Sequence, residues 1–228
     1  MVELLAATGF LLASHFGVSS TGLRGALVGR LGEKPYLGLY SLLALAAIVW
    51  LVMAYGRAPY VELWPPAAWT RWVALFATLA AALLVVAGLT GPNPTAMGQE
   101  GVLTSDEPAR GVVRITRHPF LWGVGLWALG HMAANGDLAS LIFFGAFAAL
   151  ALAGTALIDA KRARRAGAEW ERFTRLTSNP PFAAILAGRQ RLVWGEIGLA
   201  RTAGALALWV ALLALHPYLF GVYALPPT

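Results

Sequence analysis

Six apolar stretches constrain the fold of this chain more than any other feature of its sequence. They cover approximately residues 4–18, 36–55, 69–89, 119–135, 138–158 and 199–220. A hydrocarbon core of about 30 Å takes about 20 helical residues to cross, so each stretch is long enough, or nearly long enough, to span a bilayer. The sequence therefore predicts an all-α, polytopic transmembrane helix bundle of about six spans.

Composition excludes a soluble fold and several kinds of chemistry. Hydrophobic residues make up 58% of the chain and charged residues only 12%, about half the share in soluble proteins. The absence of cysteine excludes disulfides, thiolate metal sites and cysteine nucleophiles. The N-terminal stretch does not resemble a cleaved signal peptide, and no repeat or linker is visible, so residues 1–228 are expected to form a single domain.

The positions of the basic residues predict the orientation. With the N-terminus outside, fifteen Lys and Arg fall in the inner loops and two in the outer loops, as the positive-inside rule requires. The inner set is Arg24, Arg30, Lys34, Arg110, Arg114, Arg117, Lys161, Arg162, Arg164, Arg165, Arg172, Arg175, Arg189, Arg191 and Arg201. The prediction is N-out and C-out. Because these charges follow the membrane face, nucleic-acid binding is not expected.

One inner segment, residues 160–176, reads as a basic helix with Trp170, Phe173 and Leu176 at helical spacing. The simpler interpretation is a cytoplasmic surface helix that lies on anionic lipid headgroups. The alternative is a dedicated substrate-binding element. Membrane lipids are expected partners in either case.

Two of the four histidines are predicted to lie inside the membrane at similar depth. His15 lies about twelve residues into the first stretch, roughly 18 Å below the outer face, and His131 lies about twelve residues into the fourth, roughly 18 Å above the inner face. His118 falls at the inner boundary and His216 near the outer one. Ionisable groups within spans are costly and suggest function.

Neutral imidazole is a good ligand for haem iron, and two imidazoles can bind its opposite faces. The pair His15 and His131 therefore predicts a haem or metal site between helices. The alternative is that each histidine bonds to a neighbouring helix. Small residues near the second histidine leave room for a flat cofactor, or serve close helix packing. They are Gly123, Gly125, Ala128, Gly130, Ala133 and Ala134.

The sequence Arg117-His118-Pro119 predicts a second kind of site. Proline suits the first turn of a helix, and a helix N-terminus favours anions. A phosphate, a headgroup or a cofactor carboxylate is expected to bind Arg117 and His118. The alternative is a charged cap that orders the loop.

Several motifs spread over most of the chain are similar to those of one known membrane family. They are RITRHP at 114–119, GH at 130–131, NGDLAS at 135–140, the histidine at 15, LR at 23–24, LGE at 31–33 and YLGLYS at 36–41. On these motifs the chain resembles the NnrU family. The resemblance implies an integral protein of the bacterial inner (cytoplasmic) membrane, linked to nitrogen-oxide metabolism. One role that it implies is a non-enzymatic haem or nitric-oxide sensor, or an accessory protein.

The second half resembles the ζ-carotene isomerase branch of that family, through residues 170–190 and His216-Pro217. This resemblance implies a b-type haem whose iron is held by His15 and His131. It also implies redox-dependent cis–trans isomerisation of the central double bond of tri-cis-ζ-carotene, with a hydrophobic polyene or lipid as substrate and an electron donor as partner. Plant members carry a cysteine three residues before the second histidine, where this chain has Ala128.

The Arg-His-Pro sequence is also similar to that of the isoprenylcysteine methyltransferase family. Members of that family bind S-adenosylmethionine near this motif and carry paired glutamates after the next span. The corresponding place here reads Ile158-Asp159-Ala160-Lys161. A lipid methyltransferase is therefore the third hypothesis.

Overall fold

The computed structural model describes residues 1–18, 21–65 and 67–225, and their regular structure is helical throughout. The long helices are α1 (Val2–Ala13), α3 (Glu33–Gly56), α4 (Ala68–Thr90), α5 (Pro119–Asn135), α6 (Leu138–Leu176) and α9 (Leu199–Phe220). The shorter elements are η1 (Ser14–Val18), α2 (Gly22–Leu31), η2 (Glu100–Thr104), η3 (Gly111–Arg114), α7 (Ala183–Leu186) and α8 (Trp194–Ile197).

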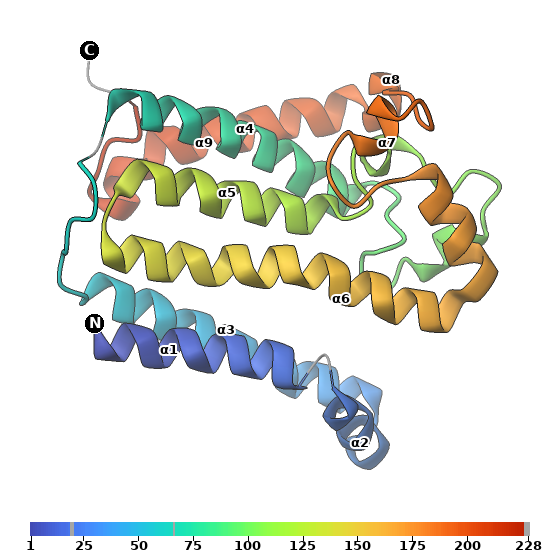
Figure 1. Cartoon of the computed structure of the whole chain (residues 1–228), viewed down its shortest axis with the longest axis horizontal. Coiled ribbons are helices and arrows are strands. Elements are labelled where there is room, and N and C mark those ends of the chain that lie inside the picture. Colours follow the sequence, from blue (N-terminus) through green and yellow to red (C-terminus); the bar gives the residue numbers. More distant parts are fainter. Residues whose placement is uncertain (19–20, 66, 226–228) are drawn as a thin grey trace.

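The long helices lie side by side and follow one another across the bundle (Figure 1). Helix α5 packs between α4 and α6, α9 packs on α4, and the pair α1 and α3 packs on the other side of α6. Both termini lie at the same end of the bundle, and the short elements gather at the opposite end. This arrangement places the N-terminus of α5 and the distal half of α6 beside the short elements.

Four helices are long and apolar enough to cross a membrane: α3, α4, α6 and α9. A fifth crossing is possible if α1 with η1 and α2, which meet at 76°, is counted as one bent span. Helix α5 matches the fourth predicted stretch but has only 17 residues, about 25 Å at 1.5 Å per residue. The structure thus gives four or five candidate spans; six spans and the N-out, C-out orientation stay predictions.

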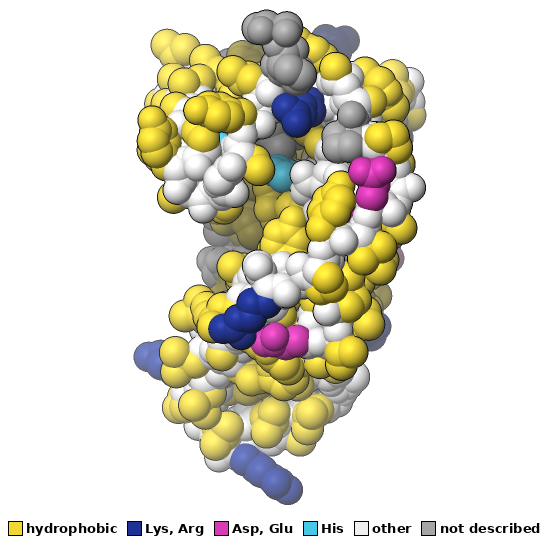
Figure 2. All heavy atoms as spheres, turned by 90° about the vertical axis from the view of Figure 1, so that its left-hand side faces the viewer, with side chains coloured by type: hydrophobic (Ala, Val, Ile, Leu, Met, Phe, Trp, Pro, Cys, Tyr) yellow, Lys and Arg dark blue, Asp and Glu magenta, His cyan; other side chains and the backbone are white. Residues whose placement is uncertain are grey.

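The outer surface is apolar, as expected of a protein surrounded by lipid. In the most apolar windows of α3 and α9 only 17% and 6% of residues are buried. Seen from the end that carries both termini, most side chains are hydrophobic and charged groups are few, and this face is hollowed near its middle (Figure 2). In a soluble protein a large exposed apolar face marks an interaction site. Here the exposed apolar faces extend over whole helices, which indicates a membrane protein.

Helix α6 is longer than predicted, because it joins the fifth stretch to the basic segment 160–176. Its backbone leaves helical geometry at Gly167, whose φ is 49°, so the element consists of two helical parts that meet at a bend. The part before the bend, residues 138–166, extends about 43 Å, which is longer than a hydrocarbon core of about 30 Å. The first half of the basic segment thus continues the span, and its second half, beyond Gly167, takes another direction; its place on lipid headgroups stays a prediction.

Glycines bring α5 into close contact with α4. A Cβ atom on Gly123 would lie 2.6 Å from Val85 Cγ2 and 3.0 Å from the Ala81 carbonyl oxygen. On Gly130 it would lie 3.1 Å from Ala77 Cβ. Helix backbones approach closely at small residues in membranes. At Gly123 and Gly130 the structure supports helix packing, because α4 fills the space beside them, and Gly125 likewise faces Leu152 of α6.

Replacing Gly123 with alanine is expected to destabilise the bundle by about 1–3 kcal/mol, the usual cost of overpacking a tight contact. The added methyl would collide with Val85 and with backbone that cannot move aside alone. Thermal unfolding in detergent measures the effect. Gly145→Ala is the matched control, since a Cβ there meets nothing within 4 Å. Equal melting temperatures for the two variants would contradict the packing argument.

Candidate functional site

Polar chemistry is concentrated in two parts of the bundle: the two predicted intramembrane histidines, and a polar cluster where α5 begins beside α6. His15 lies in η1, a π-helical turn that follows α1. Its Nδ1 lies 2.9 Å from the Leu11 carbonyl oxygen. Its ring meets the Tyr40 ring edge-on, with the centroids 5.8 Å apart. Single π turns are rare and frequently occur at functional sites.

His131 lies one turn before the end of α5, in an aromatic cluster. Its Nδ1 lies 2.8 Å from the Trp127 carbonyl oxygen. Its ring stacks on Phe144, with the centroids 4.8 Å apart. Phe144 also contacts Tyr55 at 6.1 Å and Trp127 at 5.1 Å. Because the cluster joins α3, α5 and α6, His131 is held in an apolar setting at this end of the bundle.

Both histidines share one feature that suits a metal ligand. A carbonyl oxygen cannot donate a proton, so in each ring Nδ1 carries the hydrogen and donates it to the carbonyl four residues earlier. In the neutral ring the lone pair is then on Nε2. A backbone hydrogen bond that fixes the ring in this way is the usual support of a histidine ligand. Each side chain, taken singly, fits haem iron.

The two histidines do not, however, lie together. His15 contacts Tyr40, and His131 stacks on Phe144, which contacts Tyr55. The two tyrosines are fifteen residues apart on α3, about 22 Å along the helix. The structure thus gives each histidine surroundings of its own, and a haem shared by His15 and His131 stays a prediction.

The predicted depth match assumes that both spans cross a full hydrocarbon core of about 30 Å, whereas α5 is 17 residues long. A residue twelve positions from its start is thus only four from its end, near the end of the bundle that carries the N-terminus. Among the described residues, no group of three or more His, Asp or Glu side chains is placed to hold a metal ion.

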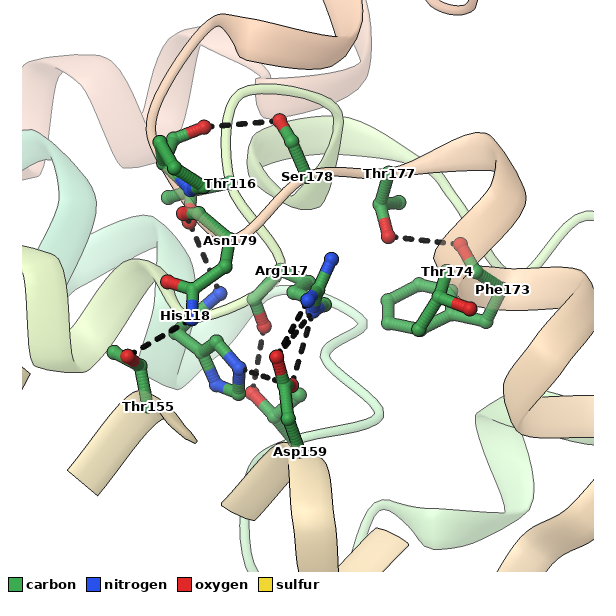
Figure 3. Close-up of polar contacts among 12 residues, drawn as sticks. Thr116, Arg117, His118, Thr155, Asp159, Phe173, Thr174, Thr177, Ser178 and Asn179 are labelled. Carbon is green, nitrogen blue, oxygen red and sulfur yellow. Dashed lines mark hydrogen bonds and ion pairs between the residues drawn. The ribbon is translucent and has the colours of Figure 1, made fainter. Parts of the chain in front are cut away.

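The polar cluster is centred on Asp159, which lies on α6 just beyond its apolar part (Figure 3). Arg117 donates from Nε to both carboxylate oxygens at 3.0 and 3.1 Å, and from a terminal nitrogen at 2.5 Å. His118 Nε2 lies 2.6 Å from Asp159 Oδ1. One carboxylate thus binds both side chains that precede α5, and it fixes the start of that helix against α6.

The cluster is buried although it lies outside the apolar spans. The His118 side chain has 0% exposure, and those of Arg117 and Asp159 have 15% and 19%. Burial lowers the pKa of His118 and outweighs the opposing effect of Asp159. Burial also acts to raise the pKa of Asp159, but hydrogen bonds from His118 and Arg117 bring it below its ordinary value. The neutral His118 ring therefore donates from Nε2 to an ionised carboxylate.

A loop that follows α6 closes over this cluster. Asn179 donates from Nδ2 to Thr155 Oγ1 at 2.9 Å and accepts from Trp122 Nε1 at 3.0 Å. Thr116 Oγ1 donates to the Asn179 carbonyl oxygen at 2.6 Å, and the Arg117 backbone N–H donates to the Ser178 carbonyl oxygen at 2.9 Å. Loop, α5 and α6 are joined here by specific hydrogen bonds.

Arg117 and His118 both contact the carboxylate of Asp159, which fits the alternative of a charged group that orders the loop. Binding of a phosphate, a headgroup or a cofactor carboxylate by these two residues stays a prediction. Asp159 was not predicted as a partner, although it is the first charged residue after the apolar part of α6. It also occupies the place where the methyltransferase family carries glutamates.

A second ionic network supports the same end of the bundle. Arg114 donates from Nε to Glu196 at 2.7 Å and from its terminal nitrogens to Gln190 at 2.5 Å and Glu107 at 2.7 Å. The Gly111 backbone N–H donates to the Glu196 carboxylate at 2.7 Å. This network connects η3 to α8, so it holds the loop before α5 against the segment that leads into α9.

The pH dependence of this network follows from Glu196. Its hydrogen bond with Arg114 lowers the Glu196 pKa, so the pair is fully stabilising above the ordinary glutamate pKa and loses its effect as the pH falls through the lowered value. We expect α8 to loosen in acid, which hydrogen–deuterium exchange of its backbone amides would report. Glu196→Gln should remove this acid transition; an unchanged transition in the variant would assign it to another group.

Comparison with known proteins finds similarity to two chloroplastic proteins over part of the chain. It is 38% identical over 82 residues to the chloroplastic 15-cis-zeta-carotene isomerase of Arabidopsis thaliana and 36% identical over 91 residues to that of Zea mays. Each alignment covers 36% of this chain and 22% of the relative, so the chain matches less than a quarter of either relative's length. No solved structure matches.

The family-level match is much more extensive. The profile of the family described as "NnrU protein" matches residues 3–224, which is nearly the whole chain. This match covers the bundle from α1 to α9 and includes both histidines and the Asp159 cluster. The chain belongs to the NnrU family.

Proposed function

We propose that this protein is a membrane-embedded cis–trans isomerase that acts on a carotenoid double bond, with tri-cis-ζ-carotene as the substrate. The observation that carries the proposal is the likeness to two 15-cis-zeta-carotene isomerases. A ζ-carotene is a long apolar polyene, and it enters a protein of this kind from the hydrocarbon phase. An apolar helix bundle with exposed faces on α3 and α9 is chemically suited to such a substrate.

The aromatic cluster around His131 is the part of the bundle that best suits a polyene. Its rings are Tyr55, Trp127, Phe143, Phe144 and Phe147, and they contact one another at centroid distances of 4.5–6.1 Å. Aromatic faces bind flat apolar groups by area and by ring geometry. His131 is the ionisable side chain that stacks on this cluster, so it is the residue that we place beside the reacting double bond.

Haem b, with His15 and His131 as ligands, is the cofactor proposed from the sequence. Bound haem would supply an iron able to donate electron density to a double bond. The fixed Nδ1–H of each histidine supports the proposal. The two rings contact different helices, His15 at Tyr40 of α3 and His131 at Phe144 of α6, so a shared iron would require them to come together.

The deciding experiment is an isomerase assay with the purified protein in the dark. Tri-cis-ζ-carotene would be supplied in liposomes, under oxidising and then reducing conditions, and the isomers separated by liquid chromatography. Formation of the di-cis product only with protein present is the expected result. Absence of conversion under both conditions, with a protein that stays folded, would refute the isomerase and leave a sensor or accessory role in nitrogen-oxide metabolism as the better hypothesis.

A further inference from the structure

A group of basic side chains meets where α6 leaves its apolar part, next to α2. Arg24 comes from α2, and Lys161, Arg162 and Arg165 come from α6. Lys161 and Arg165 are four residues apart, so they lie on the same face of the helix. We call these four residues the basic cluster. It begins two residues after Asp159, the first charge beyond the span, and so lies at the boundary between hydrocarbon and water.

The acidic residues nearby neutralise only half of the cluster. Arg24 pairs with Glu33 at 3.1 Å, and Arg162 pairs with Glu100 at 2.9 Å. Within the described part of the chain, Lys161 and Arg165 form no ion pair. Four positive charges thus face two negative ones. Like charges four residues apart on a helix repel each other, so the cluster favours an additional anion.

Two of the guanidinium groups are largely covered, which distinguishes the cluster from solvated surface charge. The side chains of Arg24 and Arg162 are 20% and 15% exposed, and Arg24 lies over the Tyr36 ring at 5.5 Å. Lys161 is half-buried; burial lowers its pKa, and the positive charges of Arg24, Arg165 and Arg162 lower it further. Three other positive side chains thus lie near the Lys161 ammonium group.

We propose that the basic cluster binds the phosphate of an anionic lipid headgroup, in the angle between α2 and α6. Arg24, Lys161 and Arg165 would donate to the phosphate oxygens, while the acyl chains lie along the adjoining apolar surface. Arg guanidinium and Lys ammonium groups are the usual phosphate ligands of proteins. Leu157, one turn before Lys161, is 39% exposed and offers such a surface. This site is separate from the histidines and does not depend on the isomerase proposal.

Native mass spectrometry of the delipidated full-length protein in detergent tests the proposal. Added phosphatidylglycerol is expected to bind more tightly than phosphatidylcholine, which carries the same phosphate with a compensating positive charge. In the variant Lys161→Gln/Arg165→Gln, the apparent affinity for phosphatidylglycerol should fall by about tenfold or more, because each basic group near an anionic headgroup contributes substantially. The charge-conserving variant Lys161→Arg/Arg165→Lys should keep the preference and shows whether the site tolerates substitution.

The control variant Arg164→Gln/Arg191→Gln removes the same net charge at two exposed positions. It should bind phosphatidylglycerol like the unaltered protein. Equal losses in both glutamine variants would mean that general surface charge attracts the lipid, and no preference in the unaltered protein would mean that there is no site. If inorganic phosphate displaces the lipid at millimolar concentration, the cluster binds soluble phosphate and the lipid proposal is wrong.

Discussion

Replacing Asp159 with alanine is expected to lower the free energy of unfolding by about 3–5 kcal/mol, the cost of removing one partner from a buried ion pair. Arg117 would stay charged in a site where its side chain is 15% exposed, and His118, which is fully buried, would lose the acceptor of its Nε2–H. The start of α5 would lose its attachment to α6. Thermal unfolding of the detergent-solubilised protein measures the loss, and hydrogen–deuterium exchange at the start of α5 reports it locally.

The matched control is Asp106→Ala, since Asp106 is an exposed carboxylate in the preceding loop. That change should alter the melting temperature little. A second comparison distinguishes the cost of leaving a buried charge unpaired from the cost of lost packing. The triple variant Asp159→Leu/Arg117→Met/His118→Phe replaces the polar group by apolar side chains, and it should recover part of the stability, as buried ion pairs elsewhere do. If Asp159→Ala melts like the control, the cluster contributes nothing to the fold.

Replacing His131 with alanine is expected to reduce isomerase activity by more than about a hundredfold, because changes to the mere supports of a metal ligand already cost 10–100-fold. The ring stacks on Phe144 within the aromatic cluster, so its loss also leaves a gap beside the substrate. The assay is conversion of tri-cis-ζ-carotene. Haem content, measured by the absorption of the oxidised and dithionite-reduced protein, should fall in the same variant and in His15→Ala.

His216→Ala is the control for this prediction. The His216 ring contacts Phe220, and its Nδ1 lies 2.8 Å from the Val222 carbonyl oxygen, outside the aromatic cluster. This variant should keep both activity and haem. Because His15 contacts Tyr40 and His131 stacks on Phe144, the two rings have different surroundings, and their single variants are expected to give different spectra. Identical spectra would mean that the two rings share an iron and that the helices rearrange to allow it.

Much of the helical architecture could be predicted from apolar length alone. The predicted stretch 36–55 became α3 (Glu33–Gly56), and the stretch 69–89 became α4 (Ala68–Thr90). Pro119 was expected at the start of a helix and is the first residue of α5. These predictions held because residues that must avoid water over about 20 positions leave few alternatives to a helix. The lengths of helices that continue beyond the hydrocarbon core were less predictable, and α6, with 39 residues, is the example.

The site was less predictable because its residues meet through tertiary packing. Arg117 and His118 stood out as charged residues beside a helix start, but Asp159 is 41 residues from His118 along the chain. The short turn between α5 and α6 could have predicted this contact. Because the two helices are antiparallel, residues equally far in sequence from the turn lie side by side. His118 and Asp159 are nearly equally far from it, to within about one helical turn. The same reasoning, applied to α5, places His131 close to the turn.

The glycine contacts between α5 and α4 limit how the bundle can admit a long, stiff molecule. Helices α4 and α5 are in close contact at Gly123 and Gly130. Asp159 on α6 binds Arg117 and His118 at the start of α5. These contacts join α4, α5 and α6 into one continuous side of the bundle. The boundary between α6 and the pair α1 and α3, on the side of the bundle that carries His15, has fewer contacts, so a long molecule dissolved in lipid would separate the helices more easily there.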